Sequence, residues 1–580
     1  MRQVSRDAQA ALIDEAVRQF TADDPTPGLV VGLVAEGQLV HVSAAGLTVL
    51  DGGRRPDQDT VFRIASMTKS FTAATTLVMR DRGLLRLDDN VSTWLPMLAD
   101  PSPRGVPLTL RHLLTMAAGF ATDDPWGDRQ QAVPLEVFDA LVTDGFSTVW
   151  TPGTRFEYSN LGYAVLGRVL AAASGTSFDA LVSDVVLAPL GLASTTFHPP
   201  GADRLAQGYA MFDGTPTAEP VAGYGAFAPM GGLFSTVADL ARWVQWFLDA
   251  EQDVQAAAPL SAASRREMSQ TQRMIGAEVV QTDALGAMRV VASGYGFGLV
   301  EELASDVGRV VSHSGGYPGF GSHMRWHPAS GLGLVALGSR TYSPMRRLIG
   351  PLLDDLVRRE ATSPSPLLAG TTRAAVDVER LLSGWDDDAA AALFADNVSA
   401  DEPLARRQAK VGAIAEEIGQ LQADDEPPQS DSSAHRLWWL RGERGRLGVE
   451  ILLSPERVPR VEAMSLTVVP DPGRPLQGAA SCLVAAINSP DPVCPIDWPD
   501  GVTLADEVDE QTVTALLRAV AARLGAVVLG KAQSHDNTAD ARTVVWQLVG
   551  ERGRGRLQVG YLAPGTVTSV TARFTLVTTV

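Results

Sequence analysis

Lysine is almost absent from this chain of 580 residues. Of 48 basic residues all but three are arginine, and lysine occurs only at Lys69, Lys410 and Lys531. Arginine keeps its proton at any useful pH, whereas lysine can lose it when its surroundings lower its pKa. Lys69 stands three residues after Ser66 in the stretch VFRIASMTKSF, so this lysine is a candidate for proton transfer at that serine.

Cysteine and positive charge are scarce as well. The two cysteines, Cys482 and Cys494, are too few for a disulfide scaffold and lack metal-ligand spacing, which leaves one disulfide or two free thiols. The formal net charge of −19 leaves no basic stripe, and this argues against a nucleic-acid or anionic-membrane partner.

Long hydrophobic runs are missing too. No apolar run reaches membrane-spanning length. The first 20 residues predict an amphipathic helix that Asp and Glu interrupt, which excludes a secretory signal in this stretch. We therefore expect a soluble, cytoplasmic protein without a membrane partner, unless a leader has been removed.

The hydrophobic pattern predicts a first domain of mixed α/β (α+β) class. Strands are expected over 28–51 and again over 293–339, with helices between them. One of these helices starts at Ser66 and stops at Gly83. This order suits an antiparallel sheet whose first and last segments meet, flanked by helices and a helical lobe. The Pro/Ser-rich stretch ATSPSP at 361–366 interrupts the pattern, and we therefore place the end of the domain at residue 362.

The rest of the chain contains an internal repeat. The tetrapeptide GERG occurs at Gly442 and at Gly550, each time after an amphipathic helix and a tryptophan-containing strand. These aligned features predict a true duplication rather than a coincidence of composition. We therefore expect two tandem small α+β domains, residues 363–470 and 471–580.

Three short motifs carry the chemistry of the first domain. They are SMTK (66–69) at a helix start, YSN (158–160) after a turn, and HSG (313–315) at the end of a strand. Ser66 and Lys69 share one face of a helix, so the lysine amine can reach the serine hydroxyl. A serine becomes a good nucleophile only when a base removes its proton, and Lys69 can do so if its pKa is lowered.

The other two motifs supply groups that such a nucleophile needs. Tyr158 can relay a proton to a leaving group, and Asn160 can bind Lys69 and a substrate carbonyl at once. Gly315 and Gly316 allow a substrate to lie along the strand edge. The backbone N–H groups of Ser66 and Gly316 would form the oxyanion hole.

With these motifs in order, roughly residues 10–355 resemble the serine β-lactamase and penicillin-binding-protein superfamily, nearest its class C-like branch. That branch includes D-aminopeptidases, DD-carboxypeptidases and β-lactamase-type esterases. The resemblance rests on the stretches DTVFRIASMTKSFTA, LTLRHLLTMAAG, PGTRFEYSNLGYAVLG and GGLFSTVADLARW. It implies a β-lactamase-like fold for residues 1–362.

The resemblance also implies roles for individual residues. Ser66 would be acylated, Lys69 and Tyr158 would handle protons, and Ser314 would contact substrate. His313 stands where many β-lactamases have lysine, and a histidine there is similar to peptidase members. This weakens β-lactam hydrolysis as the main activity.

Three further stretches of the sequence carry predictions of their own. Met116-Ala117 stands where relatives often have His-Thr, and we expect this change to alter the cavity lining without disabling the chemistry. The stretch 122–129 is either a cavity rim formed through Trp126 and Asp128 or a plain turn-rich loop. The alternating His323, Arg325 and His327 are expected on an ordinary surface strand.

The sequence thus predicts a serine hydrolase that needs neither metal nor cofactor and cleaves an amide or ester in a small molecule or peptide, such as one with a D-residue. An esterase, a peptide cyclase with the same site, or a sensor that binds β-lactam or peptidoglycan ligands without turnover stay open. The repeats are expected either to restrict substrate size or to support a homodimer.

Overall fold

The computed structural model forms two compact units. It describes residues 5–98, 105–251, 259–281, 288–359, 367–471, 474–489, 496, 498, 502–505, 508–537, 542–550, 553–562 and 566–574. The N-terminal unit comprises residues 1–278 and 290–362, and the C-terminal unit comprises residues 279–289 and 363–580.

The N-terminal unit is built on an eight-stranded sheet with the order β2-β1-β12-β11-β10-β9-β8-β7. Its strands are β1 (Gly28–Ala35), β2 (Gln38–Gly46), β7 (Arg273–Gln281), β8 (Met288–Tyr295), β9 (Val300–Ala304), β10 (Gly308–Tyr317), β11 (Phe320–His327) and β12 (Leu332–Gly338). The pairs from β2 through β8 are antiparallel. β1 pairs with β12, from Leu29 opposite Gly338 to Val34 opposite Gly333, which confirms that the first and last strands meet.

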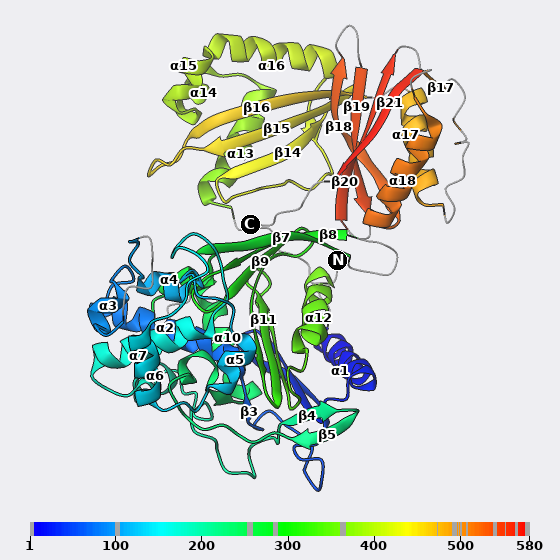
Figure 1. The fold of residues 1–580 in the computed structure, drawn as a ribbon. Coiled ribbons are helices and arrows are strands. Elements are labelled where there is room, and N and C mark those ends of the chain that lie inside the picture. The colour runs from blue at the N-terminus through cyan, green and yellow to red at the C-terminus, as the bar shows by residue number, and fades with distance from the viewer. Residues whose placement is uncertain are drawn as a thin grey trace. The chain divides into compact units, whose positions relative to one another are not determined.

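Helices cover both faces of this sheet (Figure 1). α1 (Arg6–Asp23) and α12 (Met345–Arg359) pack side by side, while α10 (Val237–Glu251) packs against β1, β2, β11 and β12. Gly333 of β12 faces Val244 of α10, and Gly338 faces Met345 of α12. Because residues five apart on a strand point to opposite faces, α10 and α12 cover opposite sides of the sheet.

A helical lobe lies between β2 and β7 in the chain. Its helices are α2 (Thr68–Asp81), α3 (Val91–Trp94), α4 (Leu110–Leu114), α5 (Asp124–Arg129), α6 (Leu135–Asp144), α7 (Asn160–Ser174), α8 (Phe178–Val182), α9 (Ala228–Gly231) and α11 (Ala262–Ser269), with short turns η1 (Ala65–Met67) and η2 (Ser183–Leu187). Its short strands pair as β3 (Phe62–Arg63) with β6 (Phe234–Ser235) and β4 (Tyr209–Phe212) with β5 (Thr215–Ala218).

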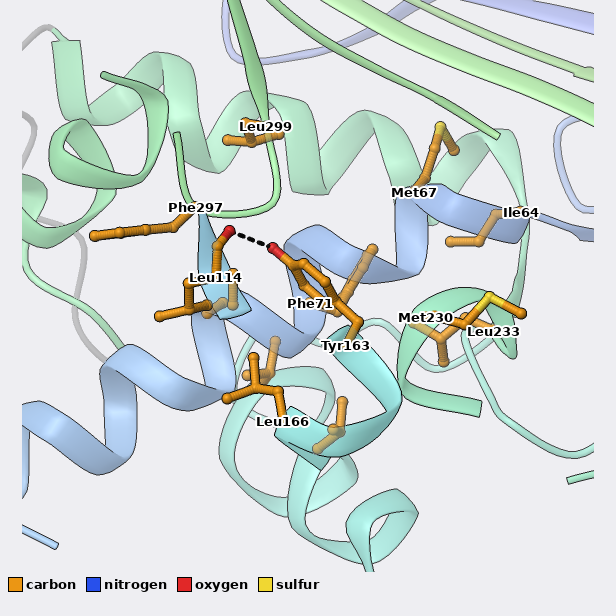
Figure 2. Packing of buried hydrophobic residues seen from close by; sticks show 14 of the residues in the cluster. Ile64, Met67, Phe71, Leu114, Tyr163, Leu166, Met230, Leu233, Phe297 and Leu299 are labelled. Atoms are coloured by element: carbon orange, nitrogen blue, oxygen red, sulfur yellow. Dashed lines mark hydrogen bonds between the residues drawn. The ribbon is translucent and has the colours of Figure 1, made fainter. Parts of the chain in front are cut away.

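The central helix of the lobe is α2, which is buried from Thr68 to Met79. Its buried threonine hydroxyls have partners, since Thr75 donates to the carbonyl of Phe71 at 2.9 Å and Thr72 donates to the carbonyl of Pro229 at 2.7 Å. Phe71 stacks on Trp243 of α10 with ring centroids 4.0 Å apart. Tyr163 of α7 lies in the same core and donates its hydroxyl to the carbonyl of Leu114 at 2.9 Å (Figure 2). The packing therefore fixes α2 against both the sheet-covering helix and α7.

The C-terminal unit contains two further sheets. The first has the order β13-β14-β15-β16, and the second has the order β17-β21-β20-β19-β18. The strands are β13 (Gln422–Ala423), β14 (His435–Arg441), β15 (Gly445–Leu453), β16 (Val461–Pro470), β17 (Thr503–Leu504), β18 (Val527–Asn537), β19 (Arg542–Gly550), β20 (Gly553–Leu562) and β21 (Thr566–Phe574). The helices are α13 (Ala369–Ser383), α14 (Asp387–Leu393), α15 (Asp396–Asp401), α16 (Leu404–Ile418), α17 (Arg474–Ile487) and α18 (Glu510–Leu524).

The order of elements agrees with the predicted repeat. α16 leads into β13 to β16 and α18 leads into β18 to β21, with Trp438 in β14 and Trp546 in β19. Both sheets belong to the same compact unit, and the duplication and the boundary after residue 470 stay predictions. The predicted break at 361–366 and Cys494 lie outside the described residues, so the choice between a disulfide with Cys482 and two free thiols stays open.

Charged side chains join the two sheets of the C-terminal unit. Arg446 of β15 pairs with Asp424 at 3.0 Å and with Glu426 at 2.5 Å, and it donates to the carbonyl of Ala532 in β18 at 3.0 Å. Lys531 of β18 reaches back to Asp424 at 2.7 Å. A cavity of about 590 Å³ opens beside this network, and its charged groups are paired with one another.

Among the described helices, none is by itself long and apolar enough to cross a membrane. The bent pair formed by α7 and the segment 178–187 meets that test by length and composition, and most of α7 is buried inside the unit.

Candidate active site

Ser66 lies in the short turn η1, directly before α2. The preceding Ala65 has φ of +49°, a left-handed conformation that is uncommon for a residue with a side chain. Strand β10 passes very close to this turn, because a Cβ atom on Gly315 would lie 2.3 Å from the carbonyl oxygen of Ile64. Ser322 of β11 also donates to that carbonyl at 2.8 Å. The sheet thus holds the turn that presents Ser66.

Lys69 is completely buried below Ser66. Its Nζ donates to Ser66 Oγ at 2.9 Å, to Asn160 Oδ1 at 2.7 Å and to the carbonyl of Met230 at 2.8 Å. Burial lowers the pKa of Lys69 to about 8, although three nearby aspartates favour its charged form. In the neutral amine, the Asn160 and Met230 oxygens would hold the two remaining hydrogens, so the lone pair would point at Ser66. The arrangement can therefore remove the serine proton.

Asn160 is held from both ends of its amide. Its Oδ1 accepts from Lys69, and its Nδ2 donates to Asp124 Oδ1 at 2.9 Å. The neighbouring Asp123 accepts from the backbone N–H of Asn160 at 2.6 Å and of Leu161 at 2.8 Å, and so caps α7. Asp124 therefore sets which end of the amide faces the lysine, a role that the sequence did not reveal.

Tyr158 contacts the same pair of residues. Its hydroxyl is hydrogen-bonded to Ser66, and Lys69 Nζ lies 4.9 Å from the centre of its ring. Burial, together with the carboxylates of Asp124 and Asp128, holds the pKa of Tyr158 well above its usual value. The phenol thus keeps its proton at neutral pH and can act as a donor.

His313 projects from β10 and is nearly completely buried. Its Nδ1 lies 2.6 Å from the carbonyl of Ser314, and its Nε2 lies 3.2 Å from the hydroxyl of Tyr295. Burial and the charge of Lys69 lower the pKa of His313 to about 3, so the ring is neutral at physiological pH. A carbonyl can only accept, so Nδ1 carries the hydrogen and Nε2 accepts from Tyr295. Tyr295 was missed, because nothing in the sequence links it to His313.

The edge of β10 is open beside these groups. β9 pairs with β10 only as far as Ser312, opposite Val300. The next part of β10 carries Gly316, where a Cβ atom would lie 2.6 Å from the ring of Tyr342. Glycine at this position makes room for the tyrosine. The oxyanion-hole role of the Ser66 and Gly316 amides stays a prediction.

A cavity of about 280 Å³ brings the predicted residues together. Its lining includes Ser66, Tyr158, His313, Ser314 and Gly316, all named from the sequence. Asn160 and Gly315 are buried and lie outside this lining, so their contact with substrate stays a prediction. The sequence did not reveal Asp124, Tyr295, Glu302, Tyr342 or Arg346, which also line the cavity.

The stretch 122–129 was expected either to form part of the cavity rim through Trp126 and Asp128 or to be a plain loop, and the structure separates these two residues. Asp128 does line the cavity, whereas Trp126 is exposed and packs edge-on against Phe227 with ring centroids 5.5 Å apart. Met116 and Ala117 were wrongly expected in the lining, because both are buried behind it. The Met116 sulfur accepts from the backbone N–H of Ser159 at 3.4 Å.

The prediction of a surface strand for residues 323–327 was wrong. β11 is buried along its whole length, because it lies between β10 and β12 and helices cover it. Arg325 is neutralised there by Glu302 and by Asp354 at 3.0 Å. His327 has partners at both nitrogens, and His323 Nδ1 bonds Ser314 Oγ at 2.8 Å. Local ion pairs and hydrogen bonds thus permit polar residues on a buried strand.

The fold and the site together describe a serine-centred cavity between an antiparallel sheet and a helical lobe, with a buried lysine beside the serine. The Beta-lactamase family model matches residues 13–358, and the chain therefore belongs to the beta-lactamase family.

Named relatives match part of the chain. Penicillin-binding protein 4* of Bacillus subtilis (strain 168) is 27% identical over 318 residues, which cover 50% of this chain and 64% of that protein. The D-alanyl-D-alanine-carboxypeptidase/endopeptidase AmpH of Escherichia coli (strain K12) is 29% identical over 324 residues, covering 54% and 80%. Esterase EstB of Burkholderia gladioli is 32% identical over 228 residues, covering 37% and 56%.

A solved structure resembles nearly the whole chain. The octameric penicillin-binding protein homologue from Pyrococcus abyssi aligns over 97% of this chain and 98% of that one, with a TM-score of 0.50 and 16% identity. At this identity the likeness concerns the fold alone.

Proposed function

We propose that this protein is a serine hydrolase that cleaves an amide or ester through an acyl-enzyme on Ser66. The observation that carries the proposal is the environment of Lys69, whose amine bonds Ser66 Oγ at 2.9 Å and has two fixed acceptors besides. The lowered pKa of this lysine supports its use as a base. The relatives named as a carboxypeptidase and as an esterase support the reaction class.

The first half of the reaction forms the acyl-enzyme. Neutral Lys69 takes the hydroxyl proton as Ser66 Oγ attacks the carbonyl carbon of the substrate, and the backbone amides of Ser66 and Gly316 stabilise the oxyanion. When the tetrahedral intermediate collapses, the bond to the leaving group breaks. Tyr158 gives its proton to that group and recovers one from Lys69.

The second half releases the product. A water molecule attacks the acyl carbon, loses a proton to the same basic groups, and Ser66 leaves as the hydroxyl. His313 is neutral and tied at both nitrogens, so we propose that it shapes the cavity without a charge of its own.

Covalent labelling tests this proposal. A fluorophosphonate should add one mass to the peptide that contains Ser66, and Ser66→Ala should abolish the adduct. Ser70→Ala is the matched control, because Ser70 lies one turn further along α2 and donates to the carbonyl of Met67. Labelling that survives in Ser66→Ala would contradict the proposal.

The fate of the acyl group separates the remaining alternatives. A nitrophenyl ester should give a burst followed by steady release in water. An acyl adduct that never decays would favour a sensor, and a cyclic product from a peptide substrate would favour a cyclase.

We also propose that the C-terminal unit is an accessory part that restricts substrate size or supports a homodimer. All the motif residues precede residue 362, so a chain ending near Thr362 should still be labelled at Ser66. Loss of labelling in a shortened chain whose circular dichroism shows a folded protein would contradict this division of roles.

A further inference from the structure

Asp128 is a buried carboxylate in the wall of the cavity that contains Ser66. It is 3% exposed, and its Oδ2 accepts from the hydroxyl of Tyr342 at 2.8 Å. Among the described residues no other hydrogen-bond donor and no ion-pair partner contacts this carboxylate. Its neighbour Arg129 turns to Glu219 at 3.1 Å. Burying an ionised carboxylate without an ion-pair partner costs free energy, and a bound cation would reduce this cost.

Tyr342 connects this carboxylate to the catalytic end of the cavity. Its ring packs where Gly316 has no side chain, and its hydroxyl reaches Asp128. The residue has φ of +51°, a conformation that is rare for a bulky side chain. Through this one side chain, Asp128 lies next to the residue whose amide is expected to hold the substrate carbonyl oxygen.

The charges around the cavity compensate Asp128 only in part, because the ammonium of Lys69 acts on it at a distance and forms no ion pair with it. The ammonium of Lys69 donates to Ser66, Asn160 and Met230, and His313 is neutral. At another part of the wall, Glu302 is paired with Arg346 at 2.6 Å. Asp124 adds a second carboxylate to the lining. The wall near Asp128 is therefore negative, and a positively charged ligand would lower its free energy.

We propose that Asp128 is a specificity-determining residue that binds the α-amino group of the substrate, next to the scissile carbonyl. The substrate class is then amino-acid amides or esters, or peptides with a free amino terminus. This inference rests on the proposed function of Ser66.

The pH dependence of this preference follows from the groups around Asp128. The pKa of Asp128 is raised to about 6, mainly by burial and to a smaller extent by Asp124 and Asp123, against the opposing effects of the Tyr342 hydroxyl and Lys69. The carboxylate is ionised above this value and protonated below it. The α-amino group of the substrate carries its charge only below about pH 8. The preference for an amine-bearing substrate should therefore be largest between about pH 6 and pH 8, and it should fall as the pH drops below 6 or rises above 8.

Two isosteric substrates test the proposal. Alanine 4-nitroanilide, in its D and L forms, carries the amine, and isobutyryl 4-nitroanilide has a methyl group in its place. The wild-type enzyme should prefer one of the alanine forms in kcat/KM by about tenfold to a hundredfold, the effect of one charge-assisted hydrogen bond. Protection of Ser66 from a fluorophosphonate by alaninamide, compared with isobutyramide, gives a second comparison of the two side groups, based on occupancy of the cavity.

Asp128→Asn should remove this preference, because it keeps an acceptor for Tyr342 and loses the charge. Asp139→Asn is the matched control, since it changes the net charge equally at a residue of α6 that pairs with Arg168 outside the cavity. Tyr342→Phe should move the lower pH midpoint of the preference upward, because the lost hydrogen bond favours the ionised form. The wild-type pH profile remains decisive if a variant fails to fold.

The result separates the two proposals. If a fluorophosphonate labels Ser66 but the alanine and isobutyryl compounds react equally, the role of Asp128 is wrong and the proposed function stands. A preference that survives in Asp128→Asn overturns the role as well. If nothing labels Ser66, the proposed function itself fails.

Discussion

Two of the three lysines stand in very different settings, Lys69 in the N-terminal unit and Lys531 in the C-terminal unit. Lys69 is buried among neutral acceptors, and its pKa is lowered to about 8. Lys531 is partly exposed and bonds Asp424 at 2.7 Å as well as Asp425, and its pKa is raised. The same side chain thus becomes a base where burial dominates and a fixed cation where carboxylates contact it. In the sequence both lysines are equally rare, so rarity alone does not distinguish the base from the fixed cation.

The largest expected effect is on acylation when Lys69 is changed to Arg. Arginine keeps the charge but cannot give a neutral amine, so the rate of Ser66 labelling by a nitrophenyl ester should fall by at least about 10²-fold. Lys531→Arg is the control and should label at the wild-type rate. An active Lys69→Arg enzyme would show that the amine is not the base, and Tyr158 would be the next candidate.

The pH profile of acylation should show the lowered pKa of Lys69. Its ammonium is the inactive form, so the rate should rise about tenfold for each pH unit below 8 and level off above it. Stopped-flow bursts with a nitrophenyl ester between pH 5 and pH 10 would measure this. A midpoint near the ordinary lysine value would mean that burial does not tune this group.

A smaller effect is expected when Asp124 is replaced. Asp124→Ala removes the acceptor that orients Asn160, and acylation should fall severalfold, up to about tenfold. Asp124 also favours the charged form of Lys69, so its loss should move the midpoint of the pH profile downward. Asp124→Asn keeps an acceptor and should show the shift with less loss of rate. A loss of rate without any shift would indicate a structural role alone.

The smallest effect belongs to Lys531. Replacing this partly exposed lysine with Met should lower the free energy of unfolding of the C-terminal unit by at most about 1 kcal/mol. Arg446 still neutralises Asp424 in that variant. Chemical denaturation followed by tryptophan fluorescence would measure the change, and a loss of several kcal/mol would show that Lys531 is essential to the joint between the two sheets.

The lysine comparison also shows what the sequence could predict. The spacing of Ser66 and Lys69 already implies contact, and the resemblance to the superfamily adds Tyr158 and His313. The structure gathers all four around one cavity or beneath it. The strand and helix order of the N-terminal unit was predictable for the same reason, since hydrophobic periodicity is local. The pairing of the first and last strands followed from that order.

What escaped prediction depends on distant contacts. Tyr295 and Tyr342 matter because one bonds His313 and the other packs on Gly316, and neither relation is visible in spacing. β11 was misjudged because polar residues were taken to face solvent, whereas Arg325 is buried with carboxylates from two other elements. Periodicity identifies a strand, but the partners that allow charge inside come from elsewhere in the chain.

The pairing of β1 with β12 has a consequence for the protein during its own synthesis. The ribosome completes β1 about three hundred residues before it completes β12, and until then β1 lacks the partner that occupies one of its edges. The strand that carries His313 and Gly316 is also made late. A nascent chain therefore contains Ser66 and Lys69 before the strand that completes their cavity, and we expect Ser66 to be unreactive until β10 has been made and paired.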